Sequence, residues 1–580
     1  KAVTTTTLGG YCTAVGSYAG KNFIRGSNTA IGYGAGMNVG YGQSNTAIGV
    51  NAMLGASSSA GTITDASTTG GSTAVGFGAA NATVNVNQRV VDVTSGRIPE
   101  GTYVLSITGT YGSVTACVLS QAATGSGTMG SQNLAFYQTN ANNCVAIGAH
   151  ALATVTTENT TATNGSGTVA IGFQTLEDQD VDNAYNTAVG WNAATNLSTG
   201  KNSVYVGYLA GGVGAIEGDS NTVIGADAGT DLVGGYSNVL LGRYVGANLT
   251  AGKENIVIGH GALDAADTAT ARDRNVAIGH NAMSGQTAAV SYCVAVGHSA
   301  LILQDANVKN TAIGGLAGAE LDSGTGNTLV GYKAGNQLDG AEGGNTFIGH
   351  EAARNADGAE NNVAVGYGAI GDGVTTGNNN VAIGHQAGKD LTGGAANVLV
   401  GKDAGKAMTT STNNIAIGYN AADAMTVLCH NNIAIGSNAL GGQATTQEGG
   451  SASANPCIAI GSNALLVQDD ADALNLAIGT DAGKAISSGT KNVLIGHEAG
   501  RALATVDGNT ALGYNALVTA VTGDNTAIGR SAGMLISSGA NNTSVGSFAL
   551  TAANGGEADN TAIGKSALAS LDSDTADGNV

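Results

Sequence analysis

Proline and charged residues are scarce in this chain. Its 580 residues include 2 prolines, Pro99 and Pro456, and 11% charged residues, which is less than half the usual share. Because proline is nearly absent and glycine does not recur at every third residue, a collagen triple helix is excluded. The low charge, beside 42% hydrophobic residues, is also the wrong composition for an intrinsically disordered chain. The composition therefore indicates a folded protein with a neutral polar surface.

Several functional classes lack their sequence signature as well. The net charge of −20 leaves no basic stripe for a nucleic acid, and no apolar run approaches the roughly 20 residues of a membrane helix. The six cysteines form neither a CxxC metal pattern nor a dense disulfide framework. Residues 366–371 match the pattern GxGxxG, but no strand–helix–strand sequence surrounds them. We therefore expect no enzyme, no catalytic or metal site and no cofactor, and neither a nucleic-acid partner nor membrane insertion.

What the chain has in abundance is glycine, and much of it belongs to a repeat. The motif Asn-Thr-Ala-Ile-Gly is first complete at residues 28–32 and returns with small changes, 28 copies in all. Most copies follow one another after 17 or 18 residues. A short fixed period of this kind indicates stacked units that cannot bury their apolar faces alone.

The three positions at the end of the motif suggest distinct roles. The residue before the glycine, such as Ile31 or Ile313, is always Ile, Val or Leu, which predicts the buried core of the coil. The residue before that is mostly Ala but also Leu240, a tolerance of size that predicts a contact surface toward neighbouring chains. The glycine itself, as in Gly32 and Gly314, is expected to turn the corner of the coil.

Two further positions are nearly fixed. Ala lies three residues after most motif glycines, as in Ala35 and Ala317, which predicts a close approach of two backbones. Asn lies four residues before most of them, as in Asn28 and Asn310, and asparagine amides can form a ladder along a stack. We interpret each unit as two short strands joined by a glycine turn and a loop. The predicted fold class is all-β, a parallel β-solenoid of about 28 coils whose exposed apolar surface favours a parallel homotrimer.

The repeat resembles those of two kinds of surface protein. It is similar to the head repeats of trimeric autotransporter adhesins, of the form Asn-Ser-Val-Ala-Ile-Gly, and more closely to the Asn-Thr-Ala-Ile-Gly-Tyr-x-Ala-Gly repeats of phage and large-virus fibres. Residues 310–314, 413–421 and 525–533 carry the likeness, which covers roughly 1–80 and 144–580. The resemblance implies a left-handed parallel β-roll, three chains around one axis, and an attachment or spacer role. The period is longer than that of autotransporter heads, which favours the viral fibre.

One long interruption divides the repeat, because 72 residues separate Gly76 from Gly148. The predicted organisation is β-roll coils over 1–80, an inserted small all-β domain over 81–143, and a continuous repeat array over 144–580. Within the insert we expect strands at 89–93, 102–108, 113–120 and 133–138.

Two groups of aromatic residues are candidate binding residues. Four lie in the insert and would contact a host-surface glycan or receptor: Tyr103, Tyr111, Phe136 and Tyr137. The alternative, that they form the insert's own core, is favoured because a small domain needs its aromatic side chains inside. The second group follows the motif glycines and includes six Tyr and six His. Its histidines suggest a metal site or a pH-sensitive seam, but packing at a subunit edge is the favoured interpretation.

These features favour one function and leave two alternatives open. The favoured function is a virion tail or head fibre, extracellular or on the virion surface, that acts as a rigid trimeric spacer and a host-surface adhesin. Its partners would be further copies of itself, side by side or end to end, and a host-cell glycan or receptor. The first alternative is a bacterial extracellular adhesin or filament built from stacked trimers. The second is a polysaccharide-degrading spike with its activity in residues 81–143.

Overall fold

The computed structural model describes most of the chain, in two compact units, Lys1–Ala289 and Val290–Val580. The described residues are 11–21, 27–37, 44–53, 143–153, 167–177, 184–212, 214–264, 272–285, 289–304, 309–338, 343–371, 373–426, 429–442, 456–469, 473–553, 556–570 and 578–580, with the backbones of six strands between residues 59 and 137. Throughout these residues the regular elements are β-strands and none is a helix, which confirms the predicted all-β class.

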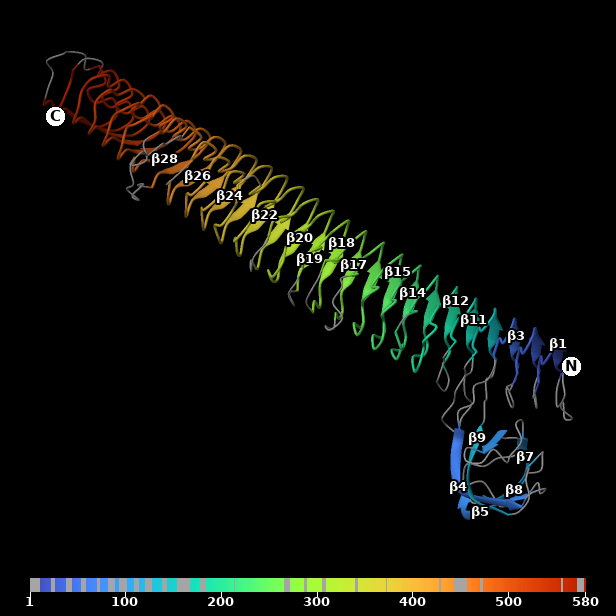
Figure 1. The fold of residues 1–580 in the computed structure, drawn as a ribbon. Coiled ribbons are helices and arrows are strands. Elements are labelled where there is room, and N and C mark those ends of the chain that lie inside the picture. The colour runs from blue at the N-terminus through green and yellow to red at the C-terminus, as the bar shows by residue number, and fades with distance from the viewer. Residues whose placement is uncertain are drawn as a thin grey trace. The chain divides into compact units, whose positions relative to one another are not determined.

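Both units contain a parallel β-solenoid in which each coil contributes one three-residue strand (Figure 1). Neighbouring strands pair in parallel and in register, so that Thr29 lies beside Thr46 and Ile31 beside Ile48. Successive coils are therefore about 4.8 Å apart, the spacing of hydrogen-bonded strands. In the first unit the strands are β1 (Thr13–Val15), β2 (Thr29–Ile31), β3 (Thr46–Ile48), β10 (Val145–Ile147), β11 (Val169–Ile171), β12 (Thr187–Val189), β13 (Val204–Val206), β14 (Thr222–Ile224), β15 (Val239–Leu241), β16 (Ile256–Ile258) and β17 (Val276–Ile278). In the second unit they are β18 (Val294–Val296), β19 (Thr311–Ile313), β20 (Thr328–Val330), β21 (Thr346–Ile348), β22 (Val363–Val365), β23 (Val381–Ile383), β24 (Val398–Val400), β25 (Ile415–Ile417), β26 (Ile433–Ile435), β27 (Ile458–Ile460), β28 (Leu476–Ile478), β29 (Val493–Ile495), β30 (Thr510–Leu512), β31 (Thr526–Ile528), β32 (Thr543–Val545) and β33 (Thr561–Ile563).

The middle residue of each strand, not the residue before the glycine, faces the interior of the coil. Ala30 and Ala312 are fully buried, whereas Ile31 and Ile313 remain 39% and 42% exposed. The prediction that Ile31 and Ile313 form the coil core is therefore wrong, and so is the outward placement of the residue before them. The reason is the narrow interior, which a methyl group already fills in most coils. Because side chains alternate along a strand, both residues that flank the buried one point outward.

Larger side chains enter the interior where a glycine makes room for them. Leu399, the middle residue of β24, is fully buried, and a Cβ atom on Gly405 would lie 2.7 Å from its Cδ2 atom. Phe347 in β21 is fully buried beside Gly335, where an added Cβ atom would lie 3.1 Å from Phe347 Cδ2. The interior is thus close-packed, and a larger residue at one position requires a smaller one at the other.

Turns form the other half of each coil. Among the described solenoid residues, the segments that follow the motif glycines contain no strand, so the predicted second strand is wrong. Backbone groups there bond the next coil instead, as from the Gly318 N–H to the Ala334 carbonyl at 3.0 Å. Ala35 and Ala317 lie in these turns and are fully buried, as expected for a position of close approach.

A six-stranded antiparallel barrel is inserted between β3 and β10. Its strands close in the order β4-β5-β8-β7-β6-β9 and are β4 (Ser59–Thr69), β5 (Ala74–Asn81), β6 (Arg89–Asp92), β7 (Thr102–Thr108), β8 (Val114–Leu119) and β9 (Thr128–Tyr137). The solenoid continues across the insertion, because Thr46 of β3 pairs directly with Val145 of β10.

The barrel begins earlier in the chain than the sequence analysis predicts. The strands expected at 89–93, 102–108, 113–120 and 133–138 correspond to β6, β7, β8 and β9. However, Gly76 lies in β5 and pairs with Ala116 of β8, so this copy of the motif belongs to the barrel and not to a coil. The predicted boundary at residue 80 therefore falls inside the barrel. The reason is that Ser-Thr-Ala-Val-Gly alternates β-forming residues, a pattern that suits a barrel strand as well as a solenoid strand.

Candidate interaction surface

An asparagine ladder inside the solenoid fixes the register of the coils. Asn310 is fully buried, and its Oδ1 atom accepts the backbone N–H of Asn327 at 2.8 Å. Its Nδ2 atom donates to the carbonyl oxygen of Gly324 at 2.7 Å. The same contact joins Asn28 to the N–H of Asn45 at 3.0 Å. These bonds confirm the predicted ladder, and because both ends of the amide are occupied, this column serves as scaffold.

The motif glycines form a second column, at the corner of the coils, that only glycine can occupy. Gly314 has a φ of 141°, and a Cβ atom there would lie 2.3 Å from the carbonyl oxygen of Gly331 in the next coil. The equivalent distance from Gly32 to the Gly49 oxygen is 2.4 Å. This geometry confirms that the glycine turns the corner of the coil.

The outer face of the strands carries an apolar strip. We define the strip as the residues directly before the motif glycines, which are Ile, Val or Leu in every strand from β18 to β33. None of these residues is buried, and Ile348, Ile383 and Leu512 are 39%, 40% and 43% exposed. The first unit has the same strip, in which Ile31 and Ile147 are 39% and 36% exposed.

Aromatic rings form a column on the other side of the glycine corner. Tyr332, His350, Tyr367 and His385 follow the motif glycines of four successive coils, with ring centroids 5.2, 5.2 and 5.3 Å apart. The Tyr332 and Tyr367 side chains are 44% and 49% exposed. The rings therefore cover one another's faces and present their edges to solvent. In the first unit, the rings of His260 and His280 stack in the same way at 5.3 Å.

The histidines of this column do not gather with further metal ligands. Within the described residues, no group of three or more His, Cys, Asp or Glu side chains is placed to hold a metal ion. One carboxylate lies near His350: the Nδ1 atom of His350 is 3.9 Å from Glu351 Oε2. Glu351 also pairs with Arg354 at 3.3 Å.

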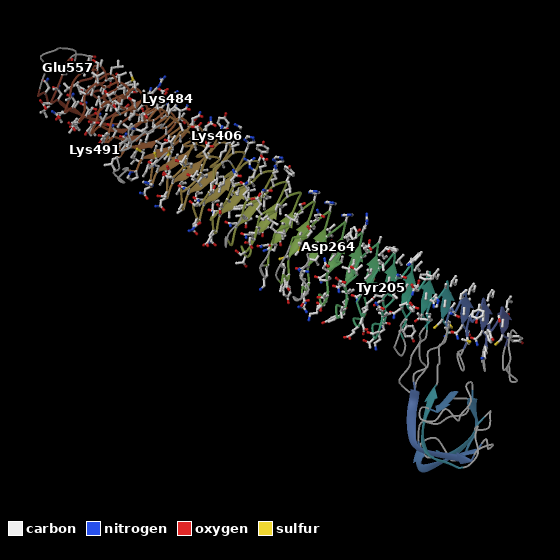
Figure 2. The ribbon with its side chains drawn as sticks, in the orientation of Figure 1. Tyr205, Asp264, Lys406, Lys484, Lys491 and Glu557 are labelled. Atoms are coloured by element: carbon white, nitrogen blue, oxygen red, sulfur yellow. The ribbon has the colours of Figure 1, made fainter. Side chains whose placement is uncertain are left out.

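The most perturbed titratable groups lie in separate coils. Burial raises the pKa of Tyr205 to about 12 and the pKa of Asp264 to about 6. Figure 2 shows these two residues on different coils of the first unit. Burial likewise raises the pKa of Cys293, a thiol at an asparagine-ladder position, to about 11. Each of these shifts therefore has its own local cause, the burial of that side chain.

The barrel strands contain three of the four aromatic candidates of the insert. Tyr103 lies in β7, and Phe136 and Tyr137 lie in β9, while Tyr111 lies outside the described residues. The strand register places Tyr103 and Tyr137 on either side of Arg89 of β6. Three of the four candidates therefore belong to neighbouring backbone positions at one end of these strands.

Two further observations concern membrane-spanning helices and similarity to known proteins. Nowhere in the described part of the chain is there a helix of the length and apolarity needed to span a bilayer. A comparison with protein-family models and with curated proteins finds no match to this chain.

Proposed function

We propose that the chain is a structural attachment fibre that holds a host-binding element at a distance from a virion. In this proposal the left-handed β-roll assembles as a parallel homotrimer and belongs to a tail or head fibre, on the virion surface or outside the cell. It acts as a spacer and adhesin and has no enzymatic activity. The observation that carries the proposal is the composition of the apolar strip.

Threonine does not occur in the strip, although the strip is not buried within a single chain. Two residues earlier in each strand, an equally outward position accepts Thr as readily as Val, as in Thr311 and Val363. Both positions are half-buried or exposed in every described solenoid strand, yet the strip position is always aliphatic. Strand propensity favours Thr as well as Val and Ile, so it does not explain the difference. A second surface that covers the strip explains it, because a hydroxyl there would lose its water without gaining a partner.

The area of the strip suits a permanent contact. In the second unit, seven of the sixteen strip residues are 37–71% exposed and the other nine are half-buried. Together they expose on the order of 1,000 Å² along β18–β33. The largest apolar patch on a typical monomer is about 300–600 Å². A strip of this size is expected to be covered in solution by another copy of the chain.

Two different columns flank the glycine corner, which favours a cyclic assembly. The aliphatic strip lies on one side and the ring column of Tyr332 and Tyr367 on the other. In a parallel ring of chains each subunit contributes two different patches to its two neighbours. Three parallel β-rolls in register satisfy this requirement and bury the strip along the whole axis.

The barrel is the element best suited to recognition of the host. In the described coils, ladder amides, methyl groups and some larger apolar side chains fill the solenoid interior, which leaves no room there for a ligand. The barrel has a different fold, and its register places Tyr103 and Tyr137 beside Arg89. Tyr and Arg are enriched at binding hot spots, which fits a host-cell glycan or receptor.

The mass of the purified chain in solution tests the assembly. Light scattering is expected to give three times the chain mass of 56.4 kDa. The double substitution Ile348→Asn and Ile383→Asn, in the strip, is expected to shift the mass toward one chain. The matched control is Val374→Asn, because Val374 is 57% exposed but lies in a loop outside the strip. A native monomer, or equal behaviour of the two variants, would refute the trimer.

Attachment to host cells tests the role of the barrel. A variant in which a short loop replaces residues 54–142 is expected to keep the trimeric mass, because β3 and β10 pair without the barrel. The same variant is expected to lose binding to the host surface. If it binds as well as the full chain, recognition lies elsewhere and this part of the proposal fails.

A further inference from the structure

The second unit has a groove on its surface that the apolar strip does not include. The groove has a volume of about 570 Å³ and crosses four successive coils, those of β27 to β30. Each coil contributes the residues five and six positions after its motif glycine. The lining residues that matter here are Val467, Lys484, Ala485, Arg501, Ala502 and Val518.

The apolar lining lies at a position that varies from coil to coil. Six residues after the motif glycine, other coils of the second unit carry polar or acidic residues, such as Glu320 and Asp390, or apolar ones, such as Leu303, Ala407 and Ala424. Three successive groove coils carry Val467, Ala485 and Ala502 there, and the fourth carries Thr519. The two alanines form a shallow floor, and Val467, which is 43% exposed, stands beside it. A run of apolar residues at a solvent-facing position indicates a surface that something else covers.

The backbone of the floor is already bonded. The Ala485 N–H donates to the Arg501 carbonyl at 3.0 Å, and the Ala502 N–H donates to the Val518 carbonyl at 2.9 Å. Polar recognition at this groove therefore depends on side chains, and the charged ones that line it are Lys484 and Arg501.

Both cations keep donors for a ligand although each has a carboxylate partner. Lys484 Nζ lies 3.2 Å from Asp481, and Arg501 Nη1 lies 3.4 Å from Glu498. The two acids are less exposed than the cations: Asp481 is 18% exposed against 35% for Lys484, and Glu498 is 22% exposed against 48% for Arg501. Neither acid lines the groove. In these ion pairs the acids approach one nitrogen of each cation, Nζ of Lys484 and Nη1 of Arg501. An ammonium has three donors and a guanidinium has five, so several remain for an anion in the groove.

The charge of Asp481 stays fixed in this arrangement. The pKa of Asp481 lies below its usual value. Burial alone would raise this pKa, but hydrogen bonds from Asn463 at 2.9 Å and from Lys484 lower it by more. Asp481 therefore stays ionised near neutral pH and holds the Lys484 side chain at the rim of the groove.

From this arrangement we propose that the groove binds a single-chain amphiphile with one anionic head group, of the alkyl carboxylate class. The head group contacts Lys484 and Arg501, and the alkyl chain lies over Ala485 and Ala502 toward Val518. Four coils span roughly 14 Å, which suits an alkyl chain of medium length. Charge complementarity favours an anion, because two cations line the groove and no carboxylate does. This site is independent of the barrel and of the strip.

Calorimetric titration of the full chain with sodium decanoate, below its micelle concentration, tests the site. We expect saturable binding that weakens about a hundredfold in the double variant Lys484→Gln and Arg501→Gln, since each of the two charge-assisted contacts is worth about 1.5 kcal/mol or more. The matched control is Lys406→Gln. Like Lys484, Lys406 lies five residues after a motif glycine, and it pairs at 3.4 Å with Asp403, the acid three residues before it. Lys406 does not line the groove. Figure 2 shows Lys406 and Lys484 along the same edge of the second unit.

Two further measurements separate the parts of the proposal. Ala502→Asp is expected to abolish binding, because it places an anion on the floor at an exposed position that tolerates substitution. Decanol, which has the tail without the charge, is expected to bind much more weakly than decanoate. The proposal is refuted if decanoate gives no saturable binding, if decanol binds equally well, or if the Lys406 variant loses as much affinity as the double variant. It is also refuted if the double variant changes the molecular mass, because the groove would then be a contact between copies of the chain.

Discussion

Replacement of one motif glycine by alanine tests the stacking of the coils most directly. Gly384 has a φ of 140°, and a Cβ atom there would lie 2.3 Å from the carbonyl oxygen of Gly401 and 2.6 Å from its carbon. The neighbouring atoms are backbone, so no side-chain rotation relieves the contact. The coil that contains Gly384 must therefore move away from the coil that contains Gly401.

The expected cost has two parts. An alanine in this region of positive φ costs about 1–3 kcal/mol. Separation of these two coils weakens the bonds that join them, such as those from the Gly401 N–H to the Ile383 carbonyl and from the Val381 N–H to the Asn397 carbonyl, both 2.8 Å long, at about 1 kcal/mol each. Together these terms give about 3–5 kcal/mol for Gly384→Ala. The matched control is Gly393→Ala, because a Cβ atom there lies 3.6 Å from Thr410 Cγ2, an ordinary contact, and the φ of Gly393 is not positive. That substitution is expected to be neutral or to stabilise by up to about 1 kcal/mol.

Hydrogen exchange shows where the cost falls. In a solenoid each coil contacts only its neighbours, so Gly384→Ala is expected to speed exchange in β22, β23 and β24 and to leave β28 to β33 protected. Thermal unfolding by circular dichroism gives the overall change. If Gly384→Ala and Gly393→Ala behave alike in both measurements, the close approach of the glycine column is refuted.

Three further substitutions test the interior. Asn397→Ala is expected to lower the free energy of unfolding by about 2–4 kcal/mol in chemical unfolding, because it leaves buried groups of the ladder without partners. Asn397→Ser is expected to cost less. The reason is that Ser203, which occupies a ladder position in another coil, accepts the equivalent backbone N–H at 3.0 Å. Gly405→Ala is expected to destabilise the fold strongly when Leu399 is present and much less when it is combined with Leu399→Ala. If the effects of the two substitutions are additive in a double-mutant cycle, the two side chains do not share one space and the interpretation is wrong. Burial raises the pKa of Asp264 to about 6 from 3.8, so the folded chain holds a proton that the unfolded chain releases, and stability falls as pH rises from about 4 to 6. Asp264→Asn is expected to reduce this loss of stability by about 1 kcal/mol, a value that allows for solvent screening of the half-buried carboxyl. Melting temperatures of the two proteins at pH 4 and pH 7 measure the difference.

The repeat predicts the stacking of the coils well, for a physical reason. The glycine and asparagine columns depend on contacts between equivalent residues of successive coils, such as Gly314 with Gly331 and Asn310 with Asn327. A contact of this kind constrains the same position in every coil, so it appears in the sequence as a nearly constant residue. The parallel register follows directly, because equivalent positions must lie side by side.

The direction of the side chains is not predictable in the same way. Alternation shows that Ala30 and Ile31 face opposite sides, but it does not show which side is inside. The choice of the aliphatic residue as the core rests on the general burial preference of Ile, and that preference fails in an interior that a methyl group fills. A second pattern in the sequence does indicate the right side: Leu399 and Leu240 occur in coils whose fourth residue after the motif glycine is also glycine, Gly405 and Gly246. Such compensation of size is typical of side chains that share one small space.

The barrel shows why function is best sought where the repeat is interrupted. In the described coils, hydrogen bonds between neighbouring coils recur from the ladder asparagine through the turn after the motif glycine, and the residues beyond this turn vary in number from coil to coil. The connection between Met53 and Asn143 contains an entire barrel, yet β3 and β10 pair in register as any two neighbours do. Closure of a longer connection costs little, since each doubling of its length adds only about 0.6 kcal/mol. The coil core therefore constrains almost nothing in these connections, and they are free to carry an element with its own fold. The groove differs, because side chains on the turns of the coils form it without lengthening any connection. A solenoid of this kind thus has two independent ways to acquire a binding site, by insertion between coils and by substitution on their outer face.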